Sequence, residues 1–406
     1  MSEYQYYEFL ALDRPLGAKE QAELRGISSR ATISSTRFAN SYSFGNLKAN
    51  PVDLVDRYFD AHLYLANWGT RALTFRFPKR LLRLDVARRY CIGRAAAMRA
   101  KGEHVVVDFC SDDEPSDWID EEEGPGHLAA LLPLRADVAS GDRRALYLGW
   151  LLCAQNGELG EADDEPPCPP GLRSLSAPLE ALVDFLRVDP DLLVAAAAGS
   201  PDARGPRTSE LEGWLATLPE DERAALLVAF VEGGDPHLRS DVLRRFGEAT
   251  DPHHPAAPRT VGQLLAEAER RRAARERAEA ELAARERARR EREAAEARGR
   301  ELDALARREA KAWAEIDAHV AAKSPRRYDE AARLLRDLRD LGVRRGDAAA
   351  IEARIEGLCA EHEGKPGFLR RVRSTLLGRP QDDVASGAGS VRVRRLARLH
   401  KRQRDV

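Results

Sequence analysis

The chain has 406 residues, of which 43% are hydrophobic and 33% are charged, and its formal net charge is −2. This length predicts two or more domains, because a single hydrophobic core stops growing beyond about 250–300 residues. The five cysteines are scattered and form no CxxC pair, which argues against a disulfide framework and a structural zinc site. We see no signal peptide and no stretch of about 18 uncharged apolar residues, so we expect a cytoplasmic protein.

Charge is distributed unevenly along the chain. Residues 1–150 hold 20 Lys and Arg against 21 Asp and Glu, a nearly even balance. Residues 151–258 hold 8 against 20, and residues 259–406 hold 37 against 26, so the middle is acidic and the end is basic. These two parts can attract each other or attract different partners. The sequence does not choose between these alternatives.

Residues 1–125 alternate between strand-like and helix-like patterns, and they predict a small α/β domain with a mixed or antiparallel sheet. Helices are predicted at Ala18–Gly26 and Leu81–Tyr90. Strands, the last two forming a hairpin, are predicted from aromatic and β-branched runs at Tyr4–Asp13, Ala31–Phe44, Ala72–Phe77, Ala95–Arg99 and Val105–Phe109.

Residues 50–68, NPVDLVDRYFDAHLYLANW, carry large apolar residues three and four positions apart, which predicts an amphipathic helix. The motif Asn67-Trp68-Gly69-Thr70-Arg71 follows at its end. Trp68 and Arg71 are candidate contacts with a ligand or partner. In the alternative interpretation, which we favour, Gly69 ends the helix and Trp68 belongs to the core.

Residues 126–258 predict an acidic helical region. Two helices are expected within His127–Asn156, and the proline-rich residues 165–171 are expected to form a stiff connector. Further helices are predicted at Pro178–Phe185, Asp191–Ala198, Ser209–Leu218, Glu222–Glu232 and His237–Phe246.

Residues 259–312 predict one long charged helix, because Leu264–Trp313 consists almost entirely of the strong helix formers Ala, Glu and Arg. Between Ala266 and Glu301 the only large apolar residue is Leu282, so this segment is a spacer rather than a pocket. Helical structure up to Val320 would span about 85 Å at ~1.5 Å per residue. A coiled-coil dimer is the alternative, although its best seam contains several arginines. Acid–base pairs four residues apart support the helix at Glu267/Arg271, Glu281/Arg285, Glu286/Arg290 and Glu296/Arg300.

Residues 313–363 predict a helical hairpin, and residues 364–406 predict a basic flexible tail. In the hairpin, Tyr328–Leu341 and Asp347–Leu358 place leucines and isoleucines on inward faces. From Lys365 onward the chain holds 12 Lys and Arg against 3 Asp and Glu, which suits contact with phosphates. Candidate nucleic-acid or anion contacts are Arg370, Arg371, Arg373, Arg392, Arg394, Arg395, Lys401 and Arg402. Phe368 is the one aromatic available there for base stacking.

Three stretches together resemble a family of bacterial hypothetical proteins that has no established activity. They are YQYYEFLALDRPL at the start, FDAHLYLANWGTR at Phe59–Arg71 and LPLRADVASGDRRALYLGWLL at Leu132–Leu152. This resemblance covers roughly residues 1–195 and transfers no active-site residue. The C-terminal hairpin is similar to helical segments of tetratricopeptide-type and SWIM zinc-finger proteins. The zinc-binding motif of the SWIM family is absent, so this resemblance implies no metal site.

Catalytic signatures are missing from the sequence, which contains no GxSxG, HExxH, GxxxxGK[ST] or strand-linked GxGxxG motif. His104, Asp108 and Cys110 share one face of a predicted strand. They are candidates for a relay that activates a nucleophile, although we favour chance placement of these common residue types. Two further groups of residues have side chains of the kinds that bind metals, but we interpret both groups as solvated segments. They are the acidic run Asp112, Asp113, Glu114, Asp117 and Glu121, and the pair His253-His254.

We therefore expect an α+β chain with no cofactor and no metal, and we regard it as a non-catalytic interaction or scaffold protein. Its two binding regions are separated by the charged helix, through which it can also dimerise, and its partner is an unknown protein. The first alternative is a nucleic-acid-associated protein that binds phosphates through the basic tail. The second is an enzyme of unknown reaction in the N-terminal domain, since a site can be built from ordinary residues. The catalytic residues of such an enzyme are unknown.

Overall fold

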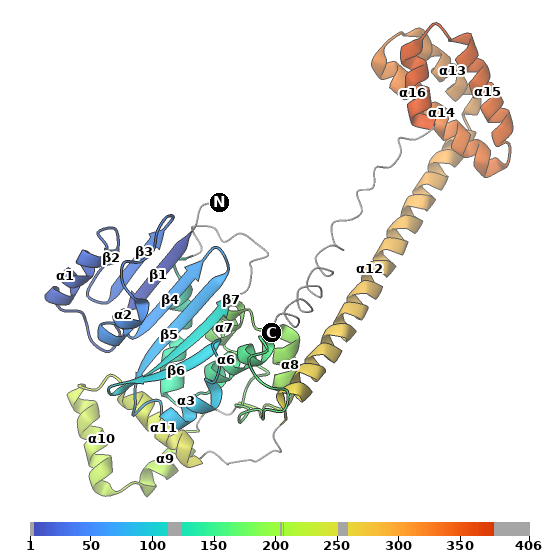
Figure 1. Cartoon of the computed structure of the whole chain (residues 1–406). Helices are drawn as coiled ribbons and strands as arrows, with labels where there is room; N and C mark the ends of the chain where they lie inside the picture. Colours follow the sequence, from blue (N-terminus) through green and yellow to red (C-terminus); the bar gives the residue numbers. More distant parts are fainter. Residues whose placement is uncertain (1–3, 113–123, 204, 206, 251–258, 377–406) are drawn as a thin grey trace, which may run out of the picture. The chain divides into compact units, whose positions relative to one another are not determined.

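A computed structural model describes residues 4–112, 124–203, 205, 207–250 and 259–376 (Figure 1). The chain divides into two compact units, which we call unit 1 (residues 1–278) and unit 2 (residues 279–406). The fold class is α+β, as predicted, with an antiparallel sheet near the N-terminus and helices through most of the remaining described residues. Within the described residues, no helix combines the length and the apolar character needed to cross a membrane.

Unit 1 contains a seven-stranded antiparallel sheet with the strand order β2-β3-β1-β4-β5-β7-β6. The first strand lies between the third and fourth, and Tyr7 is paired with Asn40 on one side and Tyr64 on the other. The predicted strands and the predicted hairpin are confirmed, except that the segment Ala31–Phe44 forms two antiparallel strands, β2 and β3, instead of one. The strands are β1 (Gln5–Leu10), β2 (Thr32–Ile33), β3 (Arg37–Tyr42), β4 (Ala61–Ala66), β5 (Thr70–Pro78), β6 (Ala96–Lys101) and β7 (His104–Asp112).

The amphipathic helix predicted for residues 50–68 is wrong in its second half. Helix α2 (Pro51–Arg57) ends early, and β4 follows it at the centre of the sheet. On β4, Leu63 faces one side of the sheet and His62 faces the other, and both are buried. A strand that is covered on both faces carries apolar residues at most positions. Such a continuous apolar run also satisfies the three- and four-residue spacing of a helix.

Asp60 holds the connection between α2 and β4 in place. Its buried carboxylate accepts the backbone N–H groups of Leu12 and Asp13 at 2.7 and 2.9 Å. The Arg76 guanidinium donates to the same carboxylate at 2.7 Å. Burial opposes ionisation of this group, but the hydrogen bonds from these three residues outweigh it and lower the pKa of Asp60. The turn is therefore fixed by contacts with residues far away in the sequence.

Helices cover both faces of the sheet. The face that carries Leu63, Phe75 and Val107 packs against α3 to α8 and the first turns of α12, and the opposite face, with Phe9 and Phe38, packs beneath α1 and α2. The helices of unit 1 besides α2 are α1 (Ala18–Ile27), α3 (Leu84–Tyr90), α4 (His127–Leu131), α5 (Pro133–Ala139), α6 (Arg144–Gln155), α7 (Ala177–Leu186), α8 (Pro190–Ala198), α9 (Thr208–Thr217), α10 (Glu220–Glu232) and α11 (Leu238–Thr250).

The charged helix α12 (Val261–Ala306) is 46 residues long. Val261 and Leu264 are buried in the core of unit 1, residues 274–296 are exposed, and Leu302 belongs to the core of unit 2. Three of the four predicted ion pairs are present, at Glu267/Arg271, Glu281/Arg285 and Glu286/Arg290. Helical structure does not run unbroken to Val320. The helix ends at Ala306, and a turn at residues 307–308 lets the next helix bring Trp313 into the same core as Leu302.

Unit 2 contains the predicted helical hairpin together with two flanking helices. They are α13 (Glu309–Ala321), α14 (Pro325–Arg345), α15 (Ala348–Glu361) and α16 (Pro366–Leu376). Trp313, Ile316 and Val320 share the buried face of α13, as expected from their spacing. Helices α14 and α15 approach closely at Gly342, where a Cβ would lie 2.9 Å from the Ile351 side chain.

Candidate functional site

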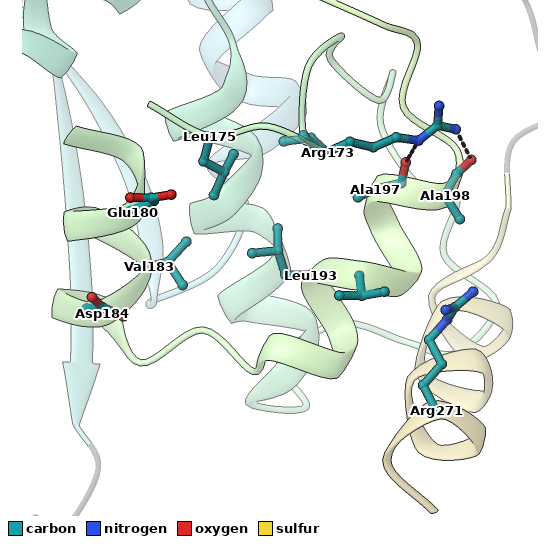
Figure 2. Close-up of a pocket in the computed structure, with 11 residues that line it drawn as sticks. Arg173, Leu175, Glu180, Val183, Asp184, Leu193, Ala197, Ala198 and Arg271 are labelled. Atoms are coloured by element: carbon teal, nitrogen blue, oxygen red, sulfur yellow. Dashed lines mark hydrogen bonds between the residues drawn. The ribbon is translucent and has the colours of Figure 1, made fainter. Parts of the chain in front are cut away.

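A groove of about 690 Å³ lies between α7 and α8 of unit 1 (Figure 2). In the close-up, Val183 of α7 and Leu193 of α8 lie between the two helices, and Leu175 lies above them. Arg271, from the first turns of α12, stands beside α8. The lining residues are Leu172, Arg173, Leu175, Glu180, Val183, Asp184, Leu193, Val194, Ala197, Ala198 and Arg271.

The first wall of the groove is the outer face of α7. This helix follows Ser176, has a proline in its first turn and ends at Arg187, which adopts a left-handed conformation with φ 58°. Its buried residues, Leu179, Leu182, Phe185 and Leu186, form the stripe that packs into the core. Glu180, Val183 and Asp184 occupy other positions of the helix and therefore line the groove.

The second wall is α8, whose two ends are both capped. At its start, the Asp189 carboxylate accepts the backbone N–H of Asp191 at 2.8 Å. At its end, the Arg173 guanidinium donates to the carbonyl oxygens of Ala197 and Ala198 at 3.2 and 3.1 Å (Figure 2). These carbonyls have no partner within the helix, so Arg173 stabilises the C-terminus of α8 while its stem lines the groove.

Arg271 reaches the groove because α12 is anchored beside α8. Arg275 donates to the Asp191 carboxylate at 2.9 Å, and Arg272 pairs with both Asp189 and Asp191. The hydrogen bond from Arg275 lowers the pKa of Asp191, with further lowering from the neighbouring positive charges. The start of the long helix is thus tied by charge to the helix that forms the second wall.

The groove combines an apolar floor with walls of opposite charge. Glu180 and Asp184 lie on α7, and Arg173 and Arg271 lie on the side of α8 (Figure 2). Val194, on the same floor, is 51% exposed. The lining of the groove contains no Ser, Cys or His. Its chemistry suits the binding of an amphipathic segment with charges of both signs.

The structure places the two predicted partner contacts, Trp68 and Arg71, in different environments. Trp68 lies in the turn between β4 and β5, where it is 45% exposed and donates to the Thr70 hydroxyl at 3.1 Å. The prediction that Trp68 is a core residue is therefore wrong. Gly69 does not end a helix either, because it occupies the same turn with φ 107°.

Arg71 contacts the helix that forms the first wall. Its guanidinium donates to the carbonyl oxygens of Asp184 and Phe185, at 3.3 and 3.4 Å, and lies 5.9 Å from the centre of the Phe185 ring. From the opposite direction, Arg187 donates to the carbonyl of Gly69 at 2.9 Å. Both contacts tie the end of α7 to the β4–β5 turn, so Arg71 supports the groove without lining it.

The predicted relay of His104, Asp108 and Cys110 shares one face of β7, as strand alternation requires. These three residues are nevertheless poorly suited to nucleophilic catalysis. Burial, together with the Asp112 carboxylate, raises the pKa of the Cys110 thiol to about 11, so this thiol is protonated at neutral pH. Asp108 accepts a hydrogen bond from the Thr74 hydroxyl at 2.7 Å, and burial raises its pKa. These residues form a half-buried polar surface of the sheet.

The basic candidates of the C-terminal part fall into two groups. Arg370, Arg371 and Arg373 lie on α16, where Arg371 pairs with Asp329 at 2.7 Å and the other two are exposed. Phe368 is fully buried against Tyr328 and His362, so its predicted role in base stacking is wrong. Arg392, Arg394, Arg395, Lys401 and Arg402 lie outside the described residues.

The remaining candidate ligands fall mostly on parts of the chain that the structure leaves undescribed. Asp113, Glu114, Asp117 and Glu121 belong to this group, as do His253 and His254. Across the described residues, no cluster of three or more His, Cys, Asp or Glu side chains could hold a metal ion. The site therefore rests on the groove, whose residues sequence reasoning missed. The one signal of the groove was that Val183, Leu193 and Val194 are apolar residues at positions outside the buried faces of α7 and α8.

No family model, no curated protein and no solved structure matches this chain.

Proposed function

We propose that the chain is a non-catalytic protein–protein interaction or scaffold protein that binds a partner segment in the groove between α7 and α8. A second binding region lies in the helices that follow the exposed middle of α12 in the sequence. The observation that carries the proposal is the groove itself, in which an apolar floor is accompanied by two carboxylates and two guanidinium groups.

The chemistry of the groove favours binding over catalysis. Apolar side chains of a partner can cover Val183, Leu193 and Val194, while its charged residues pair with the walls. Because both signs of charge are present, the groove favours one orientation of a charged segment over the reverse.

The test is capture of the tagged full-length protein from bacterial lysate, with and without nuclease, at 150 and 500 mM salt. We expect Val194→Arg to lose the captured proteins, because it places a long cation on the groove floor. Val52→Arg is the matched control, since Val52 is 43% exposed on α2, outside both proposed binding regions, and takes the same change in charge and size.

Each result has a definite meaning. Partners that survive nuclease and high salt, that disappear with Val194→Arg and that remain with Val52→Arg support the proposal. Partners that disappear with nuclease overturn it in favour of nucleic-acid association, which also predicts a steep loss of affinity between 50 and 200 mM salt. Partners that are equally retained by Val194→Arg exclude the groove as their binding site.

A further inference from the structure

Helix α10 exposes an apolar stripe that no described part of the chain covers. None of its 13 residues is buried. Leu227, Val228, Phe230 and Val231 are 67%, 54%, 75% and 82% exposed. Positions three and four apart are neighbours on a helix, so Leu227, Phe230 and Val231 form one contiguous patch, which we call the α10 stripe. Large contiguous apolar surface is rare on monomers and marks interaction sites.

The helix that carries the stripe is held in place by its neighbours. Glu222, on another face of α10, pairs with Arg245 of α11. The Arg245 guanidinium also lies 5.9 Å from the centre of the Trp214 ring of α9, and that ring packs against Phe246 of α11 at 5.7 Å. Helices α9, α10 and α11 therefore form one small cluster (Figure 1).

This cluster is fixed to the body of unit 1 through polar contacts at the start of α11. Asp235 pairs with Arg80 at 2.7 Å, and His237 lies 3.1 Å from the Asp13 carboxylate. The Ser240 hydroxyl lies 3.1 Å from that of Ser140. The α10 stripe is thus presented on an anchored element rather than on a loose end of the chain.

The surroundings of the stripe are strongly acidic. Residues 208–235 contain seven Asp and Glu and a single basic residue, Arg223. Glu220 and Asp221 precede the stripe on α10, Glu232 directly follows Val231, and all three are exposed. A second copy of α10 would bring acidic ends against acidic residues in either orientation, which is unfavourable. The same charges disfavour an anionic membrane surface.

We propose that the α10 stripe is the docking surface for a cationic amphipathic helix of a partner protein. The apolar face of that helix covers Leu227, Phe230 and Val231, and its Lys and Arg residues pair with the exposed carboxylates at both ends of α10. This surface is separate from the groove between α7 and α8, and the proposal stands without it.

The experiment measures binding of a fluorescent 18-residue peptide of leucine and lysine, spaced to form a cationic amphipathic helix, to the full-length protein. The control peptide has the same composition in an order that leaves no apolar face. We expect the first peptide to bind at least tenfold more tightly than the control. Combining Glu220→Gln, Asp221→Asn and Glu232→Gln weakens this binding and flattens its dependence on salt.

Two substitutions of exposed valines identify the surface, because each adds the same charge and size. Val231→Arg is expected to weaken peptide binding at least tenfold, and Val52→Arg, on α2, is expected to leave it unchanged. Phe230→Ser, which adds no charge, repeats the loss. The proposed function is tested at Val194 in the groove and this proposal at Val231 on α10, so the failure of each is read from a different variant.

Four results would overturn the proposal. Equal binding of both peptides would show attraction to net charge alone, and wild-type affinity in Val231→Arg would place binding elsewhere. A dimer in light scattering that Val231→Arg dissociates would assign the stripe to a second copy of the chain. Binding to phosphatidylglycerol vesicles that Val231→Arg abolishes, without peptide binding, would assign it to a membrane surface.

Discussion

Helices α6 and α10 have similarly apolar sequences, ALYLGWLLCA and AALLVAFV, and opposite environments. Every residue of α6 from Ala145 to Ala154 is buried, whereas α10 has no buried residue. Helix α6 packs directly on the sheet, which Gly149 permits, because a Cβ there would lie 2.5 Å from the Phe109 ring. Helix α10 contacts α11 through Glu222, and Asp235 and His237 in the connection between these two helices contact the body of unit 1.

The difference shows that apolar composition specifies a helix without specifying what covers it. Leaving α10 exposed forgoes the stabilisation of about 25 cal/mol per Å² that burial supplies, so its apolar residues contribute little to the stability of this chain. The comparison yields predictions for both helices and for the two faces of the sheet.

The largest effect is expected from truncating matched leucines in the two helices. Leu148→Ala removes a fully buried side chain of α6 and should destabilise unit 1 by about 3 kcal/mol. Leu227→Ala removes a side chain of α10 that is 67% exposed and should change stability by less than about 0.5 kcal/mol. Urea unfolding of both variants measures the contrast. Similar losses in the two would mean that α10 is covered in solution.

A smaller effect is expected where α6 approaches the sheet. Gly149→Ala places a methyl group against the Phe109 ring and should destabilise unit 1 by about 2 kcal/mol, because helix and strand must separate. Hydrogen exchange of β5 and β7 is the measurement, and faster exchange is expected. Unchanged exchange would contradict the close contact that distinguishes α6 from α10.

The face of the sheet opposite α6 carries His62, and its packing can be tested through the pH dependence of stability. Complete burial between Tyr7 and Phe9 lowers the pKa of His62 to about 3, from 6.5 in the unfolded chain. The unfolded state therefore takes up the proton first, and stability is lost as the pH falls below about 6.5. Between pH 7 and pH 5.5 this loss amounts to about 1 kcal/mol.

His62→Phe provides the control, because it retains a ring in the stack and removes the titrating group. Urea unfolding at pH 7 and 5.5 should show a pH dependence that is smaller by about 1 kcal/mol in this variant. An identical pH dependence in the two proteins would mean that His62 is hydrated in the folded state.

The smallest effect is expected in the cluster that carries α10. Gly213 of α9 has open space where a Cβ would lie, in contrast to Gly149. Gly213→Ala should therefore stabilise α9 by about 0.5 kcal/mol through its better helix propensity. Thermal unfolding followed by circular dichroism detects the change, and a decrease in stability would show that α9 has packing partners beyond those described.

Local pattern alone predicted most of the elements that build the candidate site. The helices expected at 178–185 and 191–198 are present as α7 and α8, and capping by Asp189 is a feature that a sequence can suggest. The groove itself was not predicted, because its lining joins residues from 172 to 271. The sequence predicted only the ion pair with Glu267 for Arg271 and no role for Arg173, and folding placed both beside the same helix.

The sequence by itself determined the α+β class, most of the helices and strands, the charged helix α12 and the hairpin in unit 2. Periodicity and propensity act over a few residues, and these features depend on nothing more. The tertiary structure decided that residues 61–66 form a central strand, that α7 and α8 enclose a groove, and that α6 is buried while α10 is exposed. These outcomes depend on which distant segments pack together, and no local pattern carries that information.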